Sequence, residues 1–344
     1  MFEMLTLSFV SGLLCYAALL IFGVVLNRFH SSSQKLVRPS LEGVHHIYSG
    51  AGVIFSGCYF GICLIVGFSS LSFVEEGTGF QYLIAPLLVM AVAGFLDDIF
   101  DFHWLPRLVF YSSVSFYFVF QTEPLVFHFD PKIVDTRLIN GFLCALILLG
   151  LTNVYNFMDG IDGMAASEAL FVLISSSCIT YFYSDSPPSP FIFLLFGPLT
   201  AFLVLNFPRA KIYMGDSGSI FLGFFFGALI LHQIDIPSWS WLILLSWFVG
   251  DGVSTLLVRL LRGQNLTVKH QTHAYQHLEN VLGTFKTLGI VHSLNLFWLF
   301  PIAILSFKNP EHGSILFLLA VFPLSVFHLY CGAGQLKPKF SRET

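Results

Sequence analysis

The sequence has little charge: only 10% of its 344 residues are Asp, Glu, Lys or Arg, 56% are hydrophobic, and the mean hydropathy is +0.79. Soluble domains carry about 25% charged residues, so this composition excludes a water-soluble globule. The net charge of −4 offers no basic surface, which excludes a nucleic-acid-binding protein.

The six cysteines form no CxxC pair, and we interpret them as small hydrophobic side chains rather than as disulfide-forming residues or zinc ligands. No Lys or Arg precedes the first apolar run, so we expect this segment to stay as a membrane anchor.

What the sequence does contain is a series of apolar stretches long enough to cross a bilayer, which takes about 20 residues in a helix. The alternating pattern of a transmembrane barrel is absent, and helices satisfy their own backbone groups. We therefore predict an all-α, polytopic membrane helical bundle that forms a single domain over residues 1–344. Its eleven predicted spans are 5–27, 50–70, 82–96, 107–121, 138–152, 164–183, 190–206, 218–234, 239–258, 287–307 and 314–331.

Lys and Arg are distributed unequally over the loops between these spans. Thirteen lie in one set of alternate loops and the C-terminal tail, and three lie in the other set. The excess of Lys and Arg marks the cytoplasmic side, so we predict an N-terminus outside and a C-terminus inside. The larger set is Arg28, Lys35, Arg38, Arg107, Arg209, Lys211, Arg259, Arg262, Lys269, Lys286, Lys337, Lys339 and Arg342, and the smaller is Lys132, Arg137 and Lys308.

Aspartates gather at the predicted cytoplasmic ends of the helices, in four clusters. Any single acid at a helix end can simply reach into water, but four clusters on one membrane face point to a site. The first cluster is a DDxxD run, Asp97, Asp98 and Asp101. Residues four apart share a helix face, and adjacent carboxylates repel unless a cation joins them. Mg²⁺ fits, because it binds a few carboxylates together with phosphate oxygens and water.

The second cluster places Asn153, Asn156, Asp159 and Asp162 three residues apart, which lines one face if the segment is helical. A structural loop needs one capping Asn or Asp rather than four. The third cluster is the run from Met214 to Ser219, in which Asp216 precedes an apolar helix. Free amides at a helix N-terminus favour phosphate, although an ordinary cap by Ser217 or Ser219 explains the run equally well.

The fourth cluster combines Asp251 with a basic loop that contains His270, His273 and His277. We expect the three histidines on one helical face, in contact with a nucleotide sugar. A zinc site and an interfacial amphipathic helix are the alternatives; zinc is disfavoured because no fourth ligand is evident.

These motifs, in this order, resemble the polyprenyl-phosphate N-acetylhexosamine-1-phosphate transferases of glycosyltransferase family 4. The HAYQH form of the last loop is most similar to the subgroup that initiates O-antigen, lipopolysaccharide or other surface polysaccharides. One difference is that the family's first cytoplasmic loop carries a basic Pro-Thr-Pro-Arg-Gly-Gly-Gly type run, where this chain reads His46 to Gly52. A ligand contact from that loop would have to come from His45 or His46. The expected active-site loops are 28–49, 97–106, 153–163, 207–219 and 259–286.

The resemblance implies a reaction and assigns roles to residues. Undecaprenyl phosphate attacks a UDP-N-acetylhexosamine and releases UMP, with Mg²⁺ as cofactor and Mn²⁺ as a substitute. Asp97, Asp98 and Asp216 are the expected catalytic and metal-binding residues, with Asp216 as the principal ligand. The expected substrate-binding residues are Asn153, Asn156, Asp159, Asp162, Asp101, Asp251, His270, His273 and His277.

The resemblance also implies the bacterial inner membrane, contact with membrane lipid and no nucleic-acid partner, and it leaves a homodimer open. Two other functions stay open at this point. A cation-coupled transporter would need acids near mid-bilayer and paired interrupted repeats. Another Mg²⁺-dependent lipid phosphotransferase would need a different motif: the CDP-alcohol enzymes require Asp-Gly-x-x-Ala-Arg, whereas Ile-Asp-Gly-Met-Ala follows Gly160 here.

Overall fold

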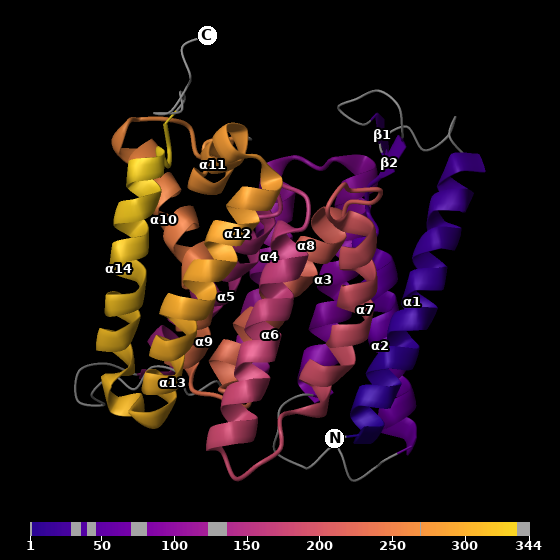
Figure 1. The fold of residues 1–344 in the computed structure, drawn as a ribbon, viewed down its shortest axis with the longest axis horizontal. Coiled ribbons are helices and arrows are strands. Elements are labelled where there is room, and N and C mark those ends of the chain that lie inside the picture. The colour runs from indigo at the N-terminus through magenta and orange to yellow at the C-terminus, as the bar shows by residue number, and fades with distance from the viewer. Residues whose placement is uncertain are drawn as a thin grey trace. The chain divides into compact units, whose positions relative to one another are not determined.

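The computed structural model describes residues 2–28, 36–39, 46–69, 81–122, 136–268 and 270–335, and helices dominate these ranges (Figure 1). Each of the eleven apolar stretches is helical, which confirms the all-α membrane class. The chain divides into two compact units, described separately below. Unit 1 is Met1–Asn156 with Pro187–Ile234, and unit 2 is Phe157–Ser186 with Asp235–Thr344. The single domain expected over 1–344 stays a prediction.

The described part of unit 1 contains seven long helices and a short hairpin. Helices α3 and α8 pack along their length, as do α1 and α7, and α2 lies against both pairs. Aromatic rings of α2 fill its contact with α8: Tyr59 meets Phe221 and Phe225 edge-on, with ring centroids 5.7 and 5.9 Å apart. The helices are α1 (Phe2–Arg28), α2 (Gly52–Ser69), α3 (Gln81–Phe100), α4 (Trp104–Thr122), α5 (Thr136–Phe157), α7 (Pro190–Asn206) and α8 (Gly215–His232).

The hairpin of unit 1 is a feature that hydropathy did not predict. Strands β1 (Val37–Pro39) and β2 (His46–Tyr48) pair antiparallel, and Tyr48 also exchanges backbone hydrogen bonds with the segment that leads into α8. The hairpin belongs to the expected first active-site loop, of which residues 29–35 and 40–45 lie outside the described residues. Of the two histidines expected to contact a ligand, His46 is the first residue of β2, and His45 lies outside the described residues.

Unit 2 contains the remaining helices, and two of its predicted spans are irregular. The span predicted over 239–258 is two helices, α9 and α10, with a bend of 73° between them. The span over 287–307 runs from α12 through the π-helix η1 into α13. The elements are α6 (Met164–Tyr183), α9 (Ser238–Leu244), α10 (Ser246–Leu261), α11 (Ala274–Leu282), α12 (Thr284–Leu294), η1 (Asn295–Leu299), α13 (Phe300–Lys308), η2 (Pro310–His312) and α14 (Gly313–Cys331).

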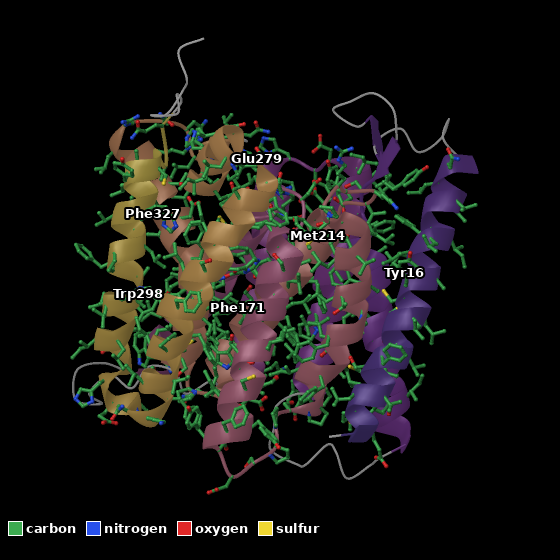
Figure 2. All side chains as sticks on the ribbon, in the orientation of Figure 1. Tyr16, Phe171, Met214, Glu279, Trp298 and Phe327 are labelled. Carbon is green, nitrogen blue, oxygen red and sulfur yellow. The ribbon has the colours of Figure 1, made fainter. Side chains whose placement is uncertain are left out.

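Several helices of each unit expose apolar side chains. Leu14 of α1 is 64% exposed and Phe322 of α14 is 70% exposed, and carbon atoms cover most of the helix surfaces in Figure 2. Exposed apolar faces of this extent identify an integral membrane protein. By length and composition, seven helices or helix pairs among the described residues can each cross a membrane, and the bent α9–α10 pair makes up to eight. Eleven spans stay a prediction, because α2 and α7 are shorter apolar helices and α4 is not among the candidate spans.

The predicted orientation can be tested with single cysteines introduced into a variant that lacks the six native ones. Cysteines near Ser186 and Asn309 should react with a membrane-impermeant maleimide added from outside intact cells, because those loops carry the smaller share of Lys and Arg. Cysteines at Gln271 and near Ser217, at the exposed position Arg209 of the same loop, should react only after the membrane is permeabilised. Labelling of the cysteine at position 209 in intact cells would contradict the assignment of this loop to the cytoplasm.

Candidate functional site

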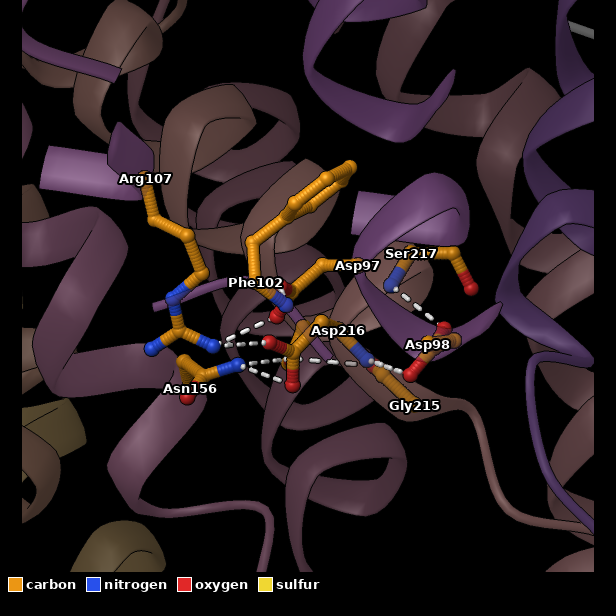
Figure 3. A network of polar contacts seen from close by, with 9 residues as sticks. Asp97, Asp98, Phe102, Arg107, Asn156, Gly215, Asp216 and Ser217 are labelled. Carbon is orange, nitrogen blue, oxygen red and sulfur yellow. Dashed lines mark hydrogen bonds and ion pairs between the residues drawn. The ribbon is translucent and has the colours of Figure 1, made fainter. Parts of the chain in front are cut away.

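In unit 1, Arg107 joins two of the predicted catalytic carboxylates (Figure 3). Its Nη1 atom donates to Asp97 Oδ2 at 2.5 Å and to Asp216 Oδ2 at 2.9 Å. Asp97 is at the end of α3, Arg107 is in the first turn of α4, and Asp216 is in the first turn of α8. Three helices therefore meet at one guanidinium nitrogen. From the sequence, Arg107 was expected only to mark the orientation of the chain in the membrane; the signal for its contact was a cation ten residues after Asp97, across a short turn.

The turn between α3 and α4 brings Arg107 back towards Asp97. Asp101 ends the helix with a left-handed φ of 54°, and its N–H donates to the Asp97 carbonyl at 2.8 Å. Asp97 Oδ1 accepts the N–H of Phe102 at 2.9 Å, which fixes the carboxylate. The prediction that Asp101 shares a helix face with Asp97 is wrong, because the helix ends at Phe100.

Asp98 caps the helix that carries Asp216. Its two carboxylate oxygens accept the backbone N–H groups of Asp216, at 2.9 Å, and Ser217, at 3.2 Å. A carboxylate at a helix N-terminus satisfies open amides and interacts favourably with the helix dipole. The expected serine cap is wrong, since the Ser217 and Ser219 hydroxyls donate to carbonyls of their own segment. The amides of Asp216 and Ser217, expected to be open to phosphate, already donate to Asp98.

Close packing of α3 on α8 sets the distance between these carboxylates. A Cβ atom added at Gly94 would lie 2.5 Å from the backbone oxygen of Asp216. Only glycine allows the two helix backbones to approach so closely. Asp97 and Asp98, one turn further along α3, thereby come within hydrogen-bond reach of the groups around Asp216.

Asn156 is the fourth predicted residue at this place. Its Nδ2 donates to Asp216 Oδ1 at 3.0 Å and to Ser219 Oγ at 2.9 Å, which orients the Asp216 carboxylate (Figure 3). Asn153, one turn earlier on α5, instead donates to the Leu149 carbonyl of its own helix. The structure thus brings Asp97, Asp98, Asn156 and Asp216 together, and it leaves Asn153 out.

In unit 2, the segment 159–163, with the sequence DGIDG, is not helical. Helix α5 ends at Phe157, and Asp159 and Asp162 lie in the loop that leads through Gly163 into α6. The predicted common face of the four Asn and Asp residues is therefore wrong. The Tyr275 hydroxyl donates to the Phe157 carbonyl at 3.0 Å and joins this loop to the histidine loop. Burial, together with the charges of Asp251 and Asp159, keeps the pKa of Tyr275 well above its ordinary value, so its hydroxyl stays a donor.

The histidine loop is held by a fully buried carboxylate. Asp251 Oδ1 accepts the N–H of Ala274 at 2.9 Å, and Oδ2 accepts the N–H of Tyr275 at 3.0 Å. These are the first two residues of α11, so Asp251 caps that helix as Asp98 caps α8. The exposed fraction of Asp251 is 0%. Its carboxylate faces the loop's backbone, which makes it a positioning group; direct contact with substrate stays a prediction.

The three histidines do not share one helical face, because α11 begins only at Ala274. His273 is the N-cap residue and pairs with Gln276 in a capping box. The rings of His270 and His273 stack with centroids 5.0 Å apart, and both lie about 6 Å from the ring of Phe157. His277 is not part of this stack; its Nε2 atom lies 3.1 Å from the Gln335 carbonyl oxygen. The first two histidines thus form one cluster, and the third contacts the segment after α14.

The ring of His270 is the more accessible of the stacked pair. Burial, followed by the neighbouring His273 and Arg259, lowers the pKa of His270 to about 4. Burial also lowers the pKa of His277. At neutral pH, His270 is therefore a neutral imidazole that forms hydrogen bonds, rather than a cation that pairs with phosphate.

No cluster of three or more His, Cys, Asp or Glu side chains is arranged to hold a metal ion within the described ranges. Two carboxylates, from Asp97 and Asp216, do converge on one cationic nitrogen. A Mg²⁺ ion is commonly bound by one or two carboxylates, with water and substrate phosphates as the other ligands.

Comparison with known proteins shows a similarity to one family. Residues 80–233, which carry Asp97, Asp98, Arg107, Asn156 and Asp216, match the family model of glycosyl transferase family 4. The chain is similar to this family over less than half of its length.

Curated relatives share 22–27% identity with this chain. The phospho-N-acetylmuramoyl-pentapeptide-transferase of Listeria innocua is 26% identical over 214 residues, 56% of this chain and 64% of that protein. The chain thus spans less than two-thirds of the length of that relative. The undecaprenyl-phosphate alpha-N-acetylglucosaminyl 1-phosphate transferase of Thermotoga maritima is 24% identical over 278 residues, 78% of this chain and 84% of that protein. A probable undecaprenyl-phosphate N-acetylglucosaminyl 1-phosphate transferase of Bacillus subtilis is 22% identical over 264 residues, 73% and 72% of the two chains.

The lowered pKa of His270 predicts a dependence of stability on pH. Between the ordinary value of 6.5 and about 4, the folded protein binds fewer protons at His270 than the unfolded chain does. The free energy of unfolding should therefore fall as the pH falls through this window. His270→Gln should make that decline shallower in thermal unfolding of the detergent-solubilised protein, whereas His312→Gln, at an exposed position, should not. Equal slopes for wild type and His270→Gln would show that His270 titrates normally.

Proposed function

We propose that this chain transfers an N-acetylhexosamine 1-phosphate from a UDP-sugar to undecaprenyl phosphate and releases UMP. The observation that carries the proposal is the meeting of Asp97 and Asp216 at Arg107, with Asp98 bound to the first amides of the Asp216 helix. The names of the Thermotoga maritima and Bacillus subtilis relatives support this substrate class.

The proposed reaction is a displacement at phosphorus. An oxygen of the lipid phosphate bonds to the β-phosphorus of the UDP-sugar, the bond from that phosphorus to the oxygen bridging the α-phosphate breaks, and UMP leaves with that oxygen. A phosphate monoester is already mostly ionised at pH 7, so the attacking oxygen needs little help from a base. Phosphoryl transfer therefore asks the protein mainly for positioning and charge stabilisation.

The carboxylates of unit 1 fit a divalent cation. Asp97 Oδ2 and Asp216 Oδ2 lie on the same guanidinium nitrogen, so a cation at that position is within reach of both. Mg²⁺, or Mn²⁺ in its place, would be held there by Asp216 and Asp97 and would neutralise charge on the transferring phosphates. Asp98 would not bind the cation itself; it would position Asp216, because it holds the first turn of α8 in place.

The remaining residues would bind and orient the substrates. Arg107, released from one carboxylate, has a planar guanidinium suited to phosphate oxygens. Asn156 keeps the Asp216 carboxylate in a fixed orientation. His270, neutral at pH 7, is suited to hydrogen bonds with the donor's sugar or phosphate, and the stacked His273 supports its ring.

The polymer that this reaction would start is a surface glycan, O-antigen or a related lipopolysaccharide component. The HAYQH sequence of the histidine loop supports this choice over the peptidoglycan pathway. The bacterial inner membrane, with the four motif loops on the cytoplasmic side, is the location that would give the enzyme access to both UDP-sugar and lipid phosphate.

The test is release of UMP by the purified full-length protein. We expect UMP when the protein is given undecaprenyl phosphate, Mg²⁺ and one member of a panel of UDP-N-acetylhexosamines, and no UMP in EDTA. Asp216→Asn should reduce the rate about 10²–10³-fold, because it removes charge from the reacting centre. The matched control Asp185→Asn, in an exposed loop, should leave the rate unchanged. Full turnover in EDTA, or a wild-type rate for Asp216→Asn, would contradict the proposal.

A further inference from the structure

Glu168 is a buried acid that neither the motifs nor the proposed reaction uses. It lies in α6, an apolar helix long enough to cross a membrane, and its exposed fraction is 0%. Within the described residues, no Lys or Arg forms an ion pair with it. A buried carboxylate without a cation costs several kcal/mol, so an acid at such a position requires a specific partner or a proton.

The partner is an amide in the π-helix of the same unit. Asn295 Nδ2 donates to Glu168 Oε2 at 2.5 Å. The other two oxygens of the pair, Glu168 Oε1 and Asn295 Oδ1, are both buried and have no hydrogen-bond partner. An ionised carboxylate only accepts hydrogen bonds, as does an amide oxygen, so the ionised form leaves both atoms unsatisfied. A single proton on the carboxyl group supplies the missing donor.

A second contact lies directly beside this pair. His292 Nε2 is 2.8 Å from the Ser167 hydroxyl, so consecutive residues of α6 bind two residues that are three apart on α12 and η1. Asn295 is the first residue of η1, and single π-helical turns often occur where a helix must aim a functional side chain. The two contacts therefore fix α6 against the junction of α12 and η1.

Helices α6 and α12 each follow one of the proposed substrate-binding loops. Helix α6 begins just after the loop that holds Asp159 and Asp162, and α12 follows the histidine loop and α11. The histidine loop and the Asp159 loop are themselves in contact through Tyr275. Its hydroxyl lies so close to Gly160 that a Cβ atom added there would overlap it. Rotation or sliding of α12 along α6 would thus move the histidine loop relative to the loop of Asp159.

We propose that Glu168 is a neutral, proton-carrying acid whose O–H donates to Asn295 Oδ1, and that this acid–amide pair positions the histidine loop against the Asp159 loop. The pair closes two parallel hydrogen bonds in an apolar interior and leaves no charge there. Glu168 is a positioning residue: it touches no substrate and acts through α12. Its effect on turnover rests on the proposed function, whereas its protonation does not.

Infrared spectroscopy of the full-length protein in lipid nanodiscs tests the protonation directly. A protonated carboxyl group has a C=O stretch that an ionised carboxylate lacks. The wild-type spectrum minus that of Glu168→Gln should contain this band at neutral pH. Asn295→Leu should shift the band to higher frequency, because the carbonyl loses a donor. The matched control Glu311→Gln, at an exposed position of unit 2, should leave it unchanged. Absence of the band from the difference spectrum would overturn the proposal even if the protein releases UMP.

Rescue by the conservative variant tests the positioning role. Glutamine offers the same donor and acceptor as a protonated glutamate, so Glu168→Gln should keep the wild-type unfolding temperature and KM for the UDP-sugar. Glu168→Leu removes both hydrogen bonds and should lower kcat/KM for the donor up to about 100-fold, the scale of a misplacement of ~1 Å. The KM for undecaprenyl phosphate should stay unchanged. If Glu168→Leu does not fold, Glu168→Gln and the infrared band still decide: a Gln variant that unfolds or loses donor binding overturns the proposal.

Discussion

The central interaction of unit 1 is the position of one guanidinium nitrogen between two carboxylates. Arg107 holds Asp97 and Asp216 together from a separate helix, and without a cation these acids would repel each other. Together with Asp98, the four side chains carry a formal charge of −2, which a divalent cation would neutralise. The same geometry therefore explains how the folded protein tolerates three neighbouring aspartates and why the site is suited to bind metal and phosphate.

Both units use an aspartate from one helix to cap another helix. Asp98 binds two amides in the first turn of α8, and Asp251 binds the first two amides of α11. Each cap satisfies backbone groups that the helix itself cannot pair and attaches a functional segment to a membrane helix. The sequence motifs therefore contain two kinds of aspartate: Asp97 and Asp216 face a cation, while Asp98 and Asp251 hold the segments that present the functional groups.

Hydropathy was sufficient to predict the long apolar helices, because a membrane helix must be both apolar and long. It could not locate helix ends: Asp101 and the DGIDG segment were expected on helix faces, and the chain leaves the helix before each. The cluster at Asp216 was predicted from motif order, but Arg107 was not, since a single arginine near a helix end is also what orientation in the membrane requires. Glu168 was hidden in an apolar run, and the significance of Asn295 depends on a π-helix that no periodicity revealed.

Binding of Mn²⁺ to the full-length protein, measured by electron paramagnetic resonance without substrates, tests the central interaction most directly. If Arg107 occupies the cation position, the metal must displace a charged hydrogen bond worth ~1.5–3 kcal/mol, so Arg107→Gln should bind Mn²⁺ about 10–100-fold more tightly than wild type. Asp216→Asn should bind it more weakly, because a ligand is lost. Equal or weaker Mn²⁺ binding by Arg107→Gln would contradict the account, since Arg107 would then not compete with the metal for Asp97 and Asp216.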